Sequence, residues 1–133
     1  MTNIYLVRHA EAEGNIYRRA QGWYDSKISP KGEKQIDALA ERFRDIHIDA
    51  VYSSDLYRTR RTAEALCKPK GLPLRLEPRF REVHVGTWED RTFGELERTQ
   101  PEALPCRFSK MVFVHLFKNS MLTRSVLTFR SSP

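Results

Sequence analysis

The feature that most constrains the fold is a strand–helix–strand pattern in the first fifty residues. Residues 3–7 and 50–52 are short apolar runs, which are typical of buried strands. Between them, Ser29 and Pro30 form a helix start, and apolar residues then recur at helical spacing, at Ile36, Leu39, Ala40 and Phe43. A helix to about Asp45 between two such strands predicts a right-handed βαβ crossover and an α/β fold with a mostly parallel sheet.

Further elements are predicted after the second strand. Residues 53–55 are expected to cap a helix that ends before Pro69, and its inner side would carry Leu56, Thr59, Ala63, Leu66 and Cys67. Residues 74–76 predict a third short strand. Thr92 opens a capping box for a helix through about Arg98.

In two long stretches the apolar residues follow neither helical nor strand spacing, and these stretches are predicted to be loops. They are residues 11–26 and 79–89, and long loops in compact domains are often functional. Residues 21–25 form a polar and aromatic cluster that suits the lining of a binding site, with a surface Trp23 as the alternative. After residue 104 the pattern becomes weaker, and residues 111–117 are a possible strand.

Arg8 and His9 follow directly on the first predicted strand. In open α/β sheets, ligands bind beyond the carboxyl ends of the strands, so this pair brings a fixed cation and a titratable imidazole to the expected binding edge. Arg58 lies in the first turn of a predicted helix, where free N–H groups and a guanidinium favour an anion such as phosphate. The alternative is that Arg58 is one solvated charge in a run with Arg60 and Arg61.

A phosphate dianion held by these cations would make His9 the natural nucleophile. Imidazole is largely neutral at pH 7 and forms covalent intermediates, and the cations would stabilise charge on the transferring phosphoryl group. Glu82, in the second loop, is the candidate general acid for the leaving alkoxide. The alternative is a loop glutamate that faces solvent.

The residues quoted so far resemble the histidine phosphatase superfamily, the phosphoglycerate mutase-like clan. The matching segments stand in the family's order over about residues 3–104; they are residues 6–11, Asn15, residues 21–25, residues 29–32, residues 53–58, Thr62, Ala63, Glu82 and residues 86–89. The resemblance implies a three-layer α/β/α phosphoglycerate mutase-like fold. It also implies metal-free transfer of phosphate to water, without a cofactor, from a small phosphomonoester.

The resemblance implies a role for each matching site residue. His9 would be the phosphorylated nucleophile and Glu82 the proton donor. Phosphate would be held by Arg8, Asn15, Gln21, Gly22 and Arg58. The chain departs from the family pattern at Ala10, in place of a glycine, and at Ala12, where a hydroxyl residue is common.

The largest departure is the missing second half of the motif set. Family members carry a later strand that ends in a second histidine, and His115 is the only candidate, followed by Leu116 and closer to Glu82 than the family spacing. The alternative is a histidine in a chance apolar run. We therefore expect an incomplete sheet with an exposed edge beside residues 4–7, and a rate lowered by roughly 10²–10³.

Composition changes near Leu104. Residues 1–104 hold 18 Lys and Arg against 17 Asp and Glu, whereas residues 105–133 hold 5 Lys and Arg and no acidic residue. We predict a histidine phosphatase part over 1–104 and an atypical basic tail over 105–133, out of frame or poorly ordered. Because the net charge of +6 belongs mostly to that tail, and aromatic residues are not interleaved with basic ones, a nucleic-acid partner is not expected.

The sequence therefore predicts a phosphomonoester hydrolase impaired by truncation. The alternatives are an inactive phosphate-binding remnant and a mutase-type phosphotransferase. No apolar run is long enough to cross a bilayer and no secretory signal is recognised, so a cytoplasmic location is expected. Cys67 and Cys106 make neither a disulfide framework nor a zinc spacing. The oligomeric state is left open.

Overall fold

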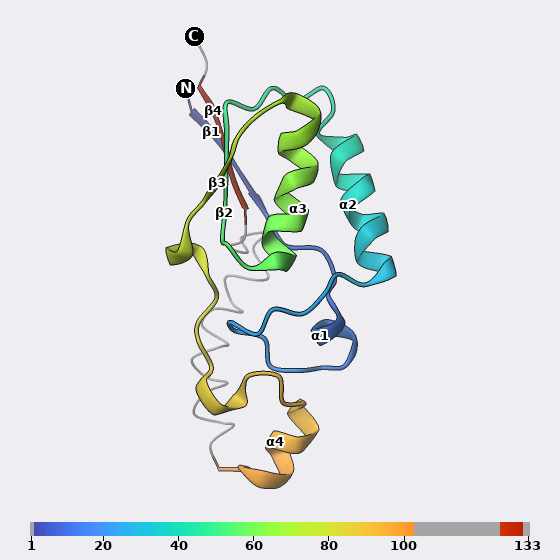
Figure 1. Ribbon diagram of the computed structural model, residues 1–133, viewed down its shortest axis with the longest axis vertical. Coiled ribbons are helices and arrows are strands. Elements are labelled where there is room, and N and C mark those ends of the chain that lie inside the picture. The colour runs from blue at the N-terminus through green and yellow to red at the C-terminus, as the bar shows by residue number, and fades with distance from the viewer. Residues whose placement is uncertain (1, 103–125, 132–133) are drawn as a thin grey trace.

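The computed structural model describes residues 2–102 and 126–131, and Figure 1 shows its elements. The strands and α-helices, in chain order, are β1 (Thr2–Val7), α1 (Glu13–Ile16), α2 (Pro30–Arg42), β2 (Ala50–Ser53), α3 (Tyr57–Cys67), β3 (Leu74–Leu76), α4 (Phe93–Thr99) and β4 (Val126–Ser131). Three short 3-10 helices are η1 (Lys68–Lys70), η2 (Pro78–Phe80) and η3 (Gly86–Trp88). Helices alternate with strands up to β3, as the sequence pattern predicts.

The four strands form one sheet in the order β1-β4-β2-β3. β2 pairs in parallel with β3, and β4 pairs antiparallel with both β1 and β2. Thr128 lies opposite Tyr5 on one side and opposite Val51 on the other. The strands β1, β2 and β3 therefore share one direction, as predicted, and β4, which the sequence did not predict, runs the other way between two of them.

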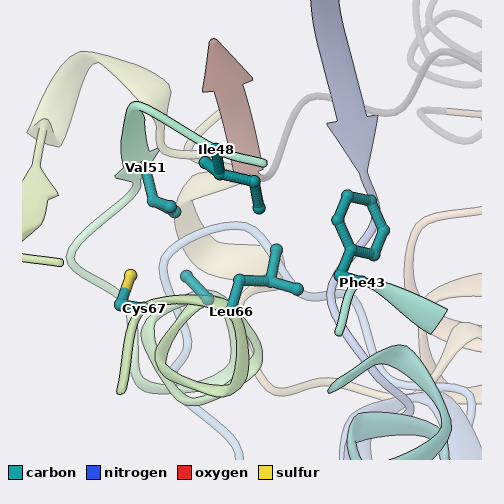
Figure 2. Close-up of a cluster of buried hydrophobic side chains, with 6 residues drawn as sticks. Phe43, Ile48, Val51, Leu66 and Cys67 are labelled. Atoms are coloured by element: carbon teal, nitrogen blue, oxygen red, sulfur yellow. The ribbon is translucent and has the colours of Figure 1, made fainter. Parts of the chain in front are cut away.

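The main core lies between the sheet and the helices α2 and α3 (Figure 2). Its buried members are Phe43, Ile48, Val51, Ala63, Leu66 and Cys67, and Tyr5 and Val7 of β1 pack against them. The predicted helix faces are confirmed, because Ile36 and Phe43 are buried while Lys34, Asp37, Glu41 and Arg44 are exposed. Burial raises the pKa of the Cys67 thiol to about 11, which fits an inert core residue.

A smaller core holds the two predicted loops together. Ala20, Trp88 and Leu96 are buried there, with Phe93 packed against them. Backbone hydrogen bonds join the same segments, from Ala20 N to Arg91 O at 2.9 Å and from Phe93 N to Arg18 O at 3.0 Å. In Figure 1 this part, with α1 and α4, lies below the sheet, on the side to which β1 leads.

One boundary and one short helix differ from the sequence-based expectation. α2 ends at Arg42 rather than near Asp45, because the chain turns at Phe43 so that Phe43 and Ile48 enter the core. The short helix α1 was not predicted. Its cap is the Asn15 side chain, whose Oδ1 accepts a hydrogen bond from Ala12 N at 2.9 Å. The possible strand at residues 111–117 lies outside the described residues.

Among the described residues, no helix is both long enough and apolar enough to span a bilayer. The predicted boundary near Leu104 stays a prediction, since its basic side lies largely outside the described residues.

Candidate active site

Arg8 and His9 continue the chain directly from the end of β1. The Arg8 side chain is exposed and makes no hydrogen bond or ion pair with the described residues. His9 is half-buried, and its Nδ1 lies 2.7 Å from the carbonyl oxygen of Ala10. Because a carbonyl oxygen only accepts, Nδ1 carries the proton and the lone pair of the neutral ring is on Nε2.

A hydrogen-bonded relay ties this segment to the helix that carries Arg58. Ala10 N donates to Thr62 Oγ1 at 3.0 Å, and Thr62 Oγ1 donates to the carbonyl of Arg58 at 2.8 Å. Both bonds are buried, so water does not compete for them. The sequence-based expectation that the two segments meet at one edge of the sheet is therefore met by their backbones.

Arg58 is a buried cation, with 2% of its surface exposed. Its Nη1 donates to the carbonyl of Tyr24 at 2.7 Å and its Nη2 to the carbonyl of Gly22 at 2.8 Å. Its Nε is buried and has no hydrogen-bond partner among the described residues. Burial lowers the pKa of Arg58, and the negative charges of Asp25, Glu82 and Glu89 oppose that shift. The alternative of a solvated surface charge is wrong for this arginine.

The other predicted phosphate ligands hold the loop around Arg58 together. Gln21 Oε1 accepts a hydrogen bond from Ser26 Oγ at 2.7 Å. Gly22 allows a close approach, because a Cβ there would lie 2.3 Å from the carbonyl oxygen of Val83. Asn15 caps α1. These contacts give the three residues structural roles, and their contacts with phosphate stay a prediction.

Glu82 lies in the exposed segment between η2 and η3. One carboxylate oxygen accepts from the N–H of Val83 at 3.1 Å, and its backbone carbonyl accepts from the indole N–H of Trp23 at 3.0 Å. The negative charge of the Glu82 carboxylate raises the pKa of Arg58, so the two side chains interact electrostatically. The structure thus brings the predicted proton donor to the loop that surrounds Arg58.

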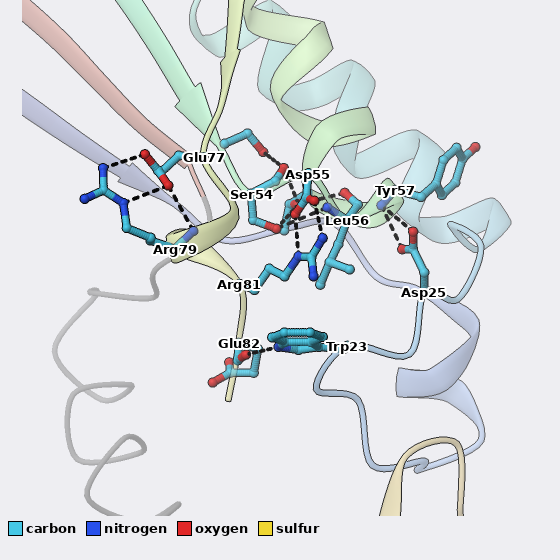
Figure 3. A network of polar contacts seen from close by, with 12 residues as sticks. Trp23, Asp25, Ser54, Asp55, Leu56, Tyr57, Glu77, Arg79, Arg81 and Glu82 are labelled. Atoms are coloured by element: carbon cyan, nitrogen blue, oxygen red, sulfur yellow. Dashed lines mark hydrogen bonds and ion pairs between the residues drawn. The ribbon is translucent and has the colours of Figure 1, made fainter. Parts of the chain in front are cut away.

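Two acidic residues make contacts near the start of α3 that were not predicted from the sequence (Figure 3). Asp25 accepts the N–H of Tyr57 at 2.7 and 2.8 Å, although it lies thirty-two residues away in the sequence. Asp55 forms a two-pronged ion pair with Arg81. The predicted cap at residues 53–55 is therefore only partly correct. Residue 56 is the N-cap and makes no side-chain cap bond, and Asp25 supplies the missing acceptor.

Glu89 fastens the loop at residues 22–24. Its carboxylate accepts the N–H groups of Gly22 at 3.2 Å, Trp23 at 2.9 Å, Tyr24 at 2.6 Å and Val85 at 3.0 Å. Burial by itself would raise the pKa of Glu89, but these four donors lower it below its ordinary value of 4.5. The carbonyls of Gly22 and Tyr24 are thereby held in place for Arg58.

We expect Glu89→Gln to destabilise the fold by about 2 kcal/mol at pH 7, because an amide offers one oxygen to four donors. A folded-state pKa below 4.5 means that the carboxylate stabilises the fold fully above that pH and loses this effect as the pH falls through the folded value. Denaturant unfolding should therefore show the two proteins converging in stability below pH 4.5. Glu97→Gln, at an exposed site on α4, is the control, and an equal loss there would contradict the role of Glu89.

In the part of the chain that the structure describes, no three His, Cys, Asp or Glu side chains lie close enough together to hold a metal ion. The expected absence of a metal and of a cofactor stays a prediction. What the described residues offer is a half-buried imidazole, a buried guanidinium, an exposed guanidinium and a nearby carboxylate.

The chain is similar to curated proteins over most of its length. The probable phosphoglycerate mutase GpmB of Photorhabdus laumondii is 46% identical over 96 residues, which make up 72% of this chain and 45% of that protein. The GpmB of Escherichia fergusonii is 44% identical over the same shares of the two chains. The chain therefore spans about half the length of the curated relatives it matches.

Solved structures match over a similar share. Bacillus stearothermophilus YhfR superposes with a TM-score of 0.70 at 35% identity, covering 75% of this chain and 49% of that one. A mycobacterial glucosyl-3-phosphoglycerate phosphatase, solved with VO3, gives a TM-score of 0.72 at 31% identity, covering 79% and 52%.

The family model itself covers most of the chain. The model of the histidine phosphatase superfamily (branch 1) matches residues 4–113. The segments that carry Arg8, His9, Arg58 and Glu82 all lie within that match. This chain belongs to the histidine phosphatase superfamily and has its phosphoglycerate mutase-like α/β fold.

Proposed function

We propose that the chain hydrolyses small phosphomonoesters through a phosphohistidine on His9. The observation that carries the proposal is the contact of 2.7 Å between His9 Nδ1 and the carbonyl of Ala10. That contact directs the lone pair to Nε2 and fixes the ring relative to the end of β1. A neutral imidazole with a defined nucleophilic atom is what the first step requires.

The proposed reaction has two steps. Nε2 attacks phosphorus, the bond from phosphorus to the ester oxygen breaks, and Glu82 gives its proton to the departing alkoxide. A water molecule then attacks the phosphohistidine and gives a proton to the Glu82 carboxylate, and inorganic phosphate leaves with the neutral imidazole restored. Glu82 therefore acts as acid and then as base.

The guanidinium groups would supply most of the electrostatic stabilisation. The transferring phosphoryl group carries negative charge on its equatorial oxygens, and preorganised cations lower its free energy without reorganisation. Arg8 would approach from the exposed side, and Arg58 would contribute its positive charge from its buried position. Asn15, Gln21 and Gly22 complete the proposed phosphate site.

A mutase is the second candidate, because the curated relatives are named as probable phosphoglycerate mutases. The two reactions share the phosphohistidine and differ in what accepts its phosphate. Incubation with 3-phosphoglycerate separates them, since a phosphatase releases inorganic phosphate and a mutase forms 2-phosphoglycerate.

The test is rapid mixing with a ³²P-labelled phosphomonoester, followed by denaturation at alkaline pH, where phosphohistidine survives. We expect label on the protein that is stable to base and lost in acid, together with release of phosphate. A folded protein that is neither labelled nor active would contradict the proposal and leave the alternative of an inactive phosphate-binding remnant. The reduced rate, the small-molecule substrate and the cytoplasmic location stay predictions.

A further inference from the structure

We propose that Arg81 is a positioning residue, which holds Glu82 where it can protonate the leaving group. This inference rests on the proposed function, since the role of Glu82 belongs to it. Arg81 is the residue immediately before Glu82, and its side chain makes two contacts with groups from other parts of the chain. Figure 3 shows its guanidinium between Asp55 and the ring of Trp23.

The first contact is the ion pair with Asp55. Arg81 Nε donates to Asp55 Oδ1 at 2.6 Å, and Nη2 donates to Oδ2. About a quarter of each side chain is exposed. Asp55 stands between β2 and α3, where the backbone is fixed by both elements. The Arg81 hydrogen bond lowers the pKa of Asp55 below its ordinary value, so the pair favours the charged carboxylate.

The second contact is with the indole of Trp23. The Arg81 guanidinium carbon lies 4.6 Å from the centre of that ring, within the range of a cation–π contact. The indole N–H donates to the backbone carbonyl of Glu82 at 3.0 Å, and Trp23 N donates to Glu89 at 2.9 Å. Trp23 thus connects the side chain of Arg81 to the backbone of the very next residue.

The Glu82 segment is exposed at Glu82, Val83 and His84, and these residues lie between two 3-10 helices without belonging to either. Trp23 holds it through the Glu82 carbonyl and through an edge-to-face contact with the His84 ring, at 4.9 Å between ring centres. Within the described part of the chain, the N–H of Val83 donates to the Glu82 carboxylate itself. Since general acid catalysis requires the donor within hydrogen-bond reach of the leaving oxygen, loss of Arg81 should misplace it.

The leaving group makes this claim testable. An alkyl phosphate such as β-glycerophosphate expels a strongly basic alkoxide and needs the proton. 2,4-Dinitrophenyl phosphate expels a stable phenolate and does not. We expect Arg81→Ala to lower kcat/KM, which reports the steps up to departure of the leaving group, by roughly 100-fold on β-glycerophosphate and by less than about threefold on 2,4-dinitrophenyl phosphate.

Arg79→Ala is the matched control. Arg79 is two residues earlier and forms the same two-pronged ion pair, with Glu77, at 2.9 and 2.7 Å. Its ion pair includes neither Trp23 nor Glu82, and its side chain is 86% exposed. Removing it should leave both rates within a factor of two.

A second measurement does not require turnover. The chain has two tryptophans, so its NMR spectrum has two indole N–H signals. Trp88 is buried and donates to Gln100 at 2.7 Å, which makes it an internal reference for an intact fold. Arg81→Ala should shift the Trp23 signal and speed its hydrogen exchange, while the Trp88 signal stays unchanged and Arg79→Ala moves neither.

The outcomes separate the two proposals. An active wild type in which Arg81→Ala lowers kcat/KM equally for both substrates, or for neither, would overturn the role of Arg81 and leave the proposed function standing. A wild type without turnover or label would overturn the proposed function. In that case an unchanged Trp23 signal in Arg81→Ala would also overturn the positioning of the Glu82 segment, and a shifted signal would support it.

Discussion

Replacement of His9 by alanine is expected to remove the covalent label and to lower turnover by roughly 10⁴–10⁶-fold. The reason is that no other group in the described part of the chain presents a nucleophilic nitrogen beside Arg8 at the end of β1. The guanidinium of Arg58 would still bind the phosphate. Phosphate should therefore continue to raise the melting temperature of His9→Ala, so that loss of chemistry is separated from loss of binding.

His47→Ala is the control for this prediction. His47 is an exposed histidine that pairs with Asp49 at 3.1 Å, with its side chain 68% exposed. Its replacement should leave labelling and turnover unchanged. If His9→Ala kept the base-stable label, the phosphoryl group would be on another residue, and the assignment of the nucleophile would be wrong.

Replacement of Thr128 by proline is expected to lower the free energy of unfolding by about 3 kcal/mol or more. β4 has a strand on each side at this position, so the N–H of residue 128 faces a neighbour whichever way it points. Proline removes that donor, and a central strand rarely tolerates it. Since a domain of this size has a total stability of about 5–15 kcal/mol, the loss would show directly in denaturant unfolding.

Thr128→Ala isolates the backbone effect, because alanine keeps the N–H. It should unfold at nearly the denaturant concentration of the wild type. If Thr128→Pro had an equally small effect, the hydrogen bonds of β4 to β1 and β2 would contribute little to the stability of the sheet.

The elements with local signals were predicted from the sequence. Ser29 caps α2 through a hydrogen bond to Gly32 N at 2.9 Å, and Thr92 with Glu95 forms the predicted capping box of α4. In these cases the donor and acceptor lie within three residues, so the pattern contains all the information. The apolar stripes of α2 and α3 are local in the same sense.

Contacts between residues that are far apart in the sequence could not be predicted. Asp25 satisfies the start of α3, and Arg81 pairs with Asp55 across twenty-six residues. No spacing rule connects such residues, because the fold alone brings them together. The only available signal for Arg81 was its place beside Glu82 in a loop that was already a candidate for function.

The candidate site shows the same division. The places of Arg8 and His9 after a strand and of Arg58 in the first turn of a helix could be predicted, because each has a local sequence signal. The burial of Arg58 could not, because it depends on the loop carbonyls of Gly22 and Tyr24. The position of β4 was also missed, since a tail rich in Ser, Phe, Val and Leu gives no indication of its pairing partner.

The place of β4 determines when the end of the sheet that carries Arg8 and His9 can form during synthesis. Among the described residues β1 pairs only with β4, which lies about 120 residues later, and closing so long a loop costs about 4 kcal/mol of chain entropy. At a ribosomal rate of 5–20 residues per second, β1 waits roughly 6–24 s before its partner is made. The strand that leads to Arg8 and His9 is thus translated well before the strand with which it pairs.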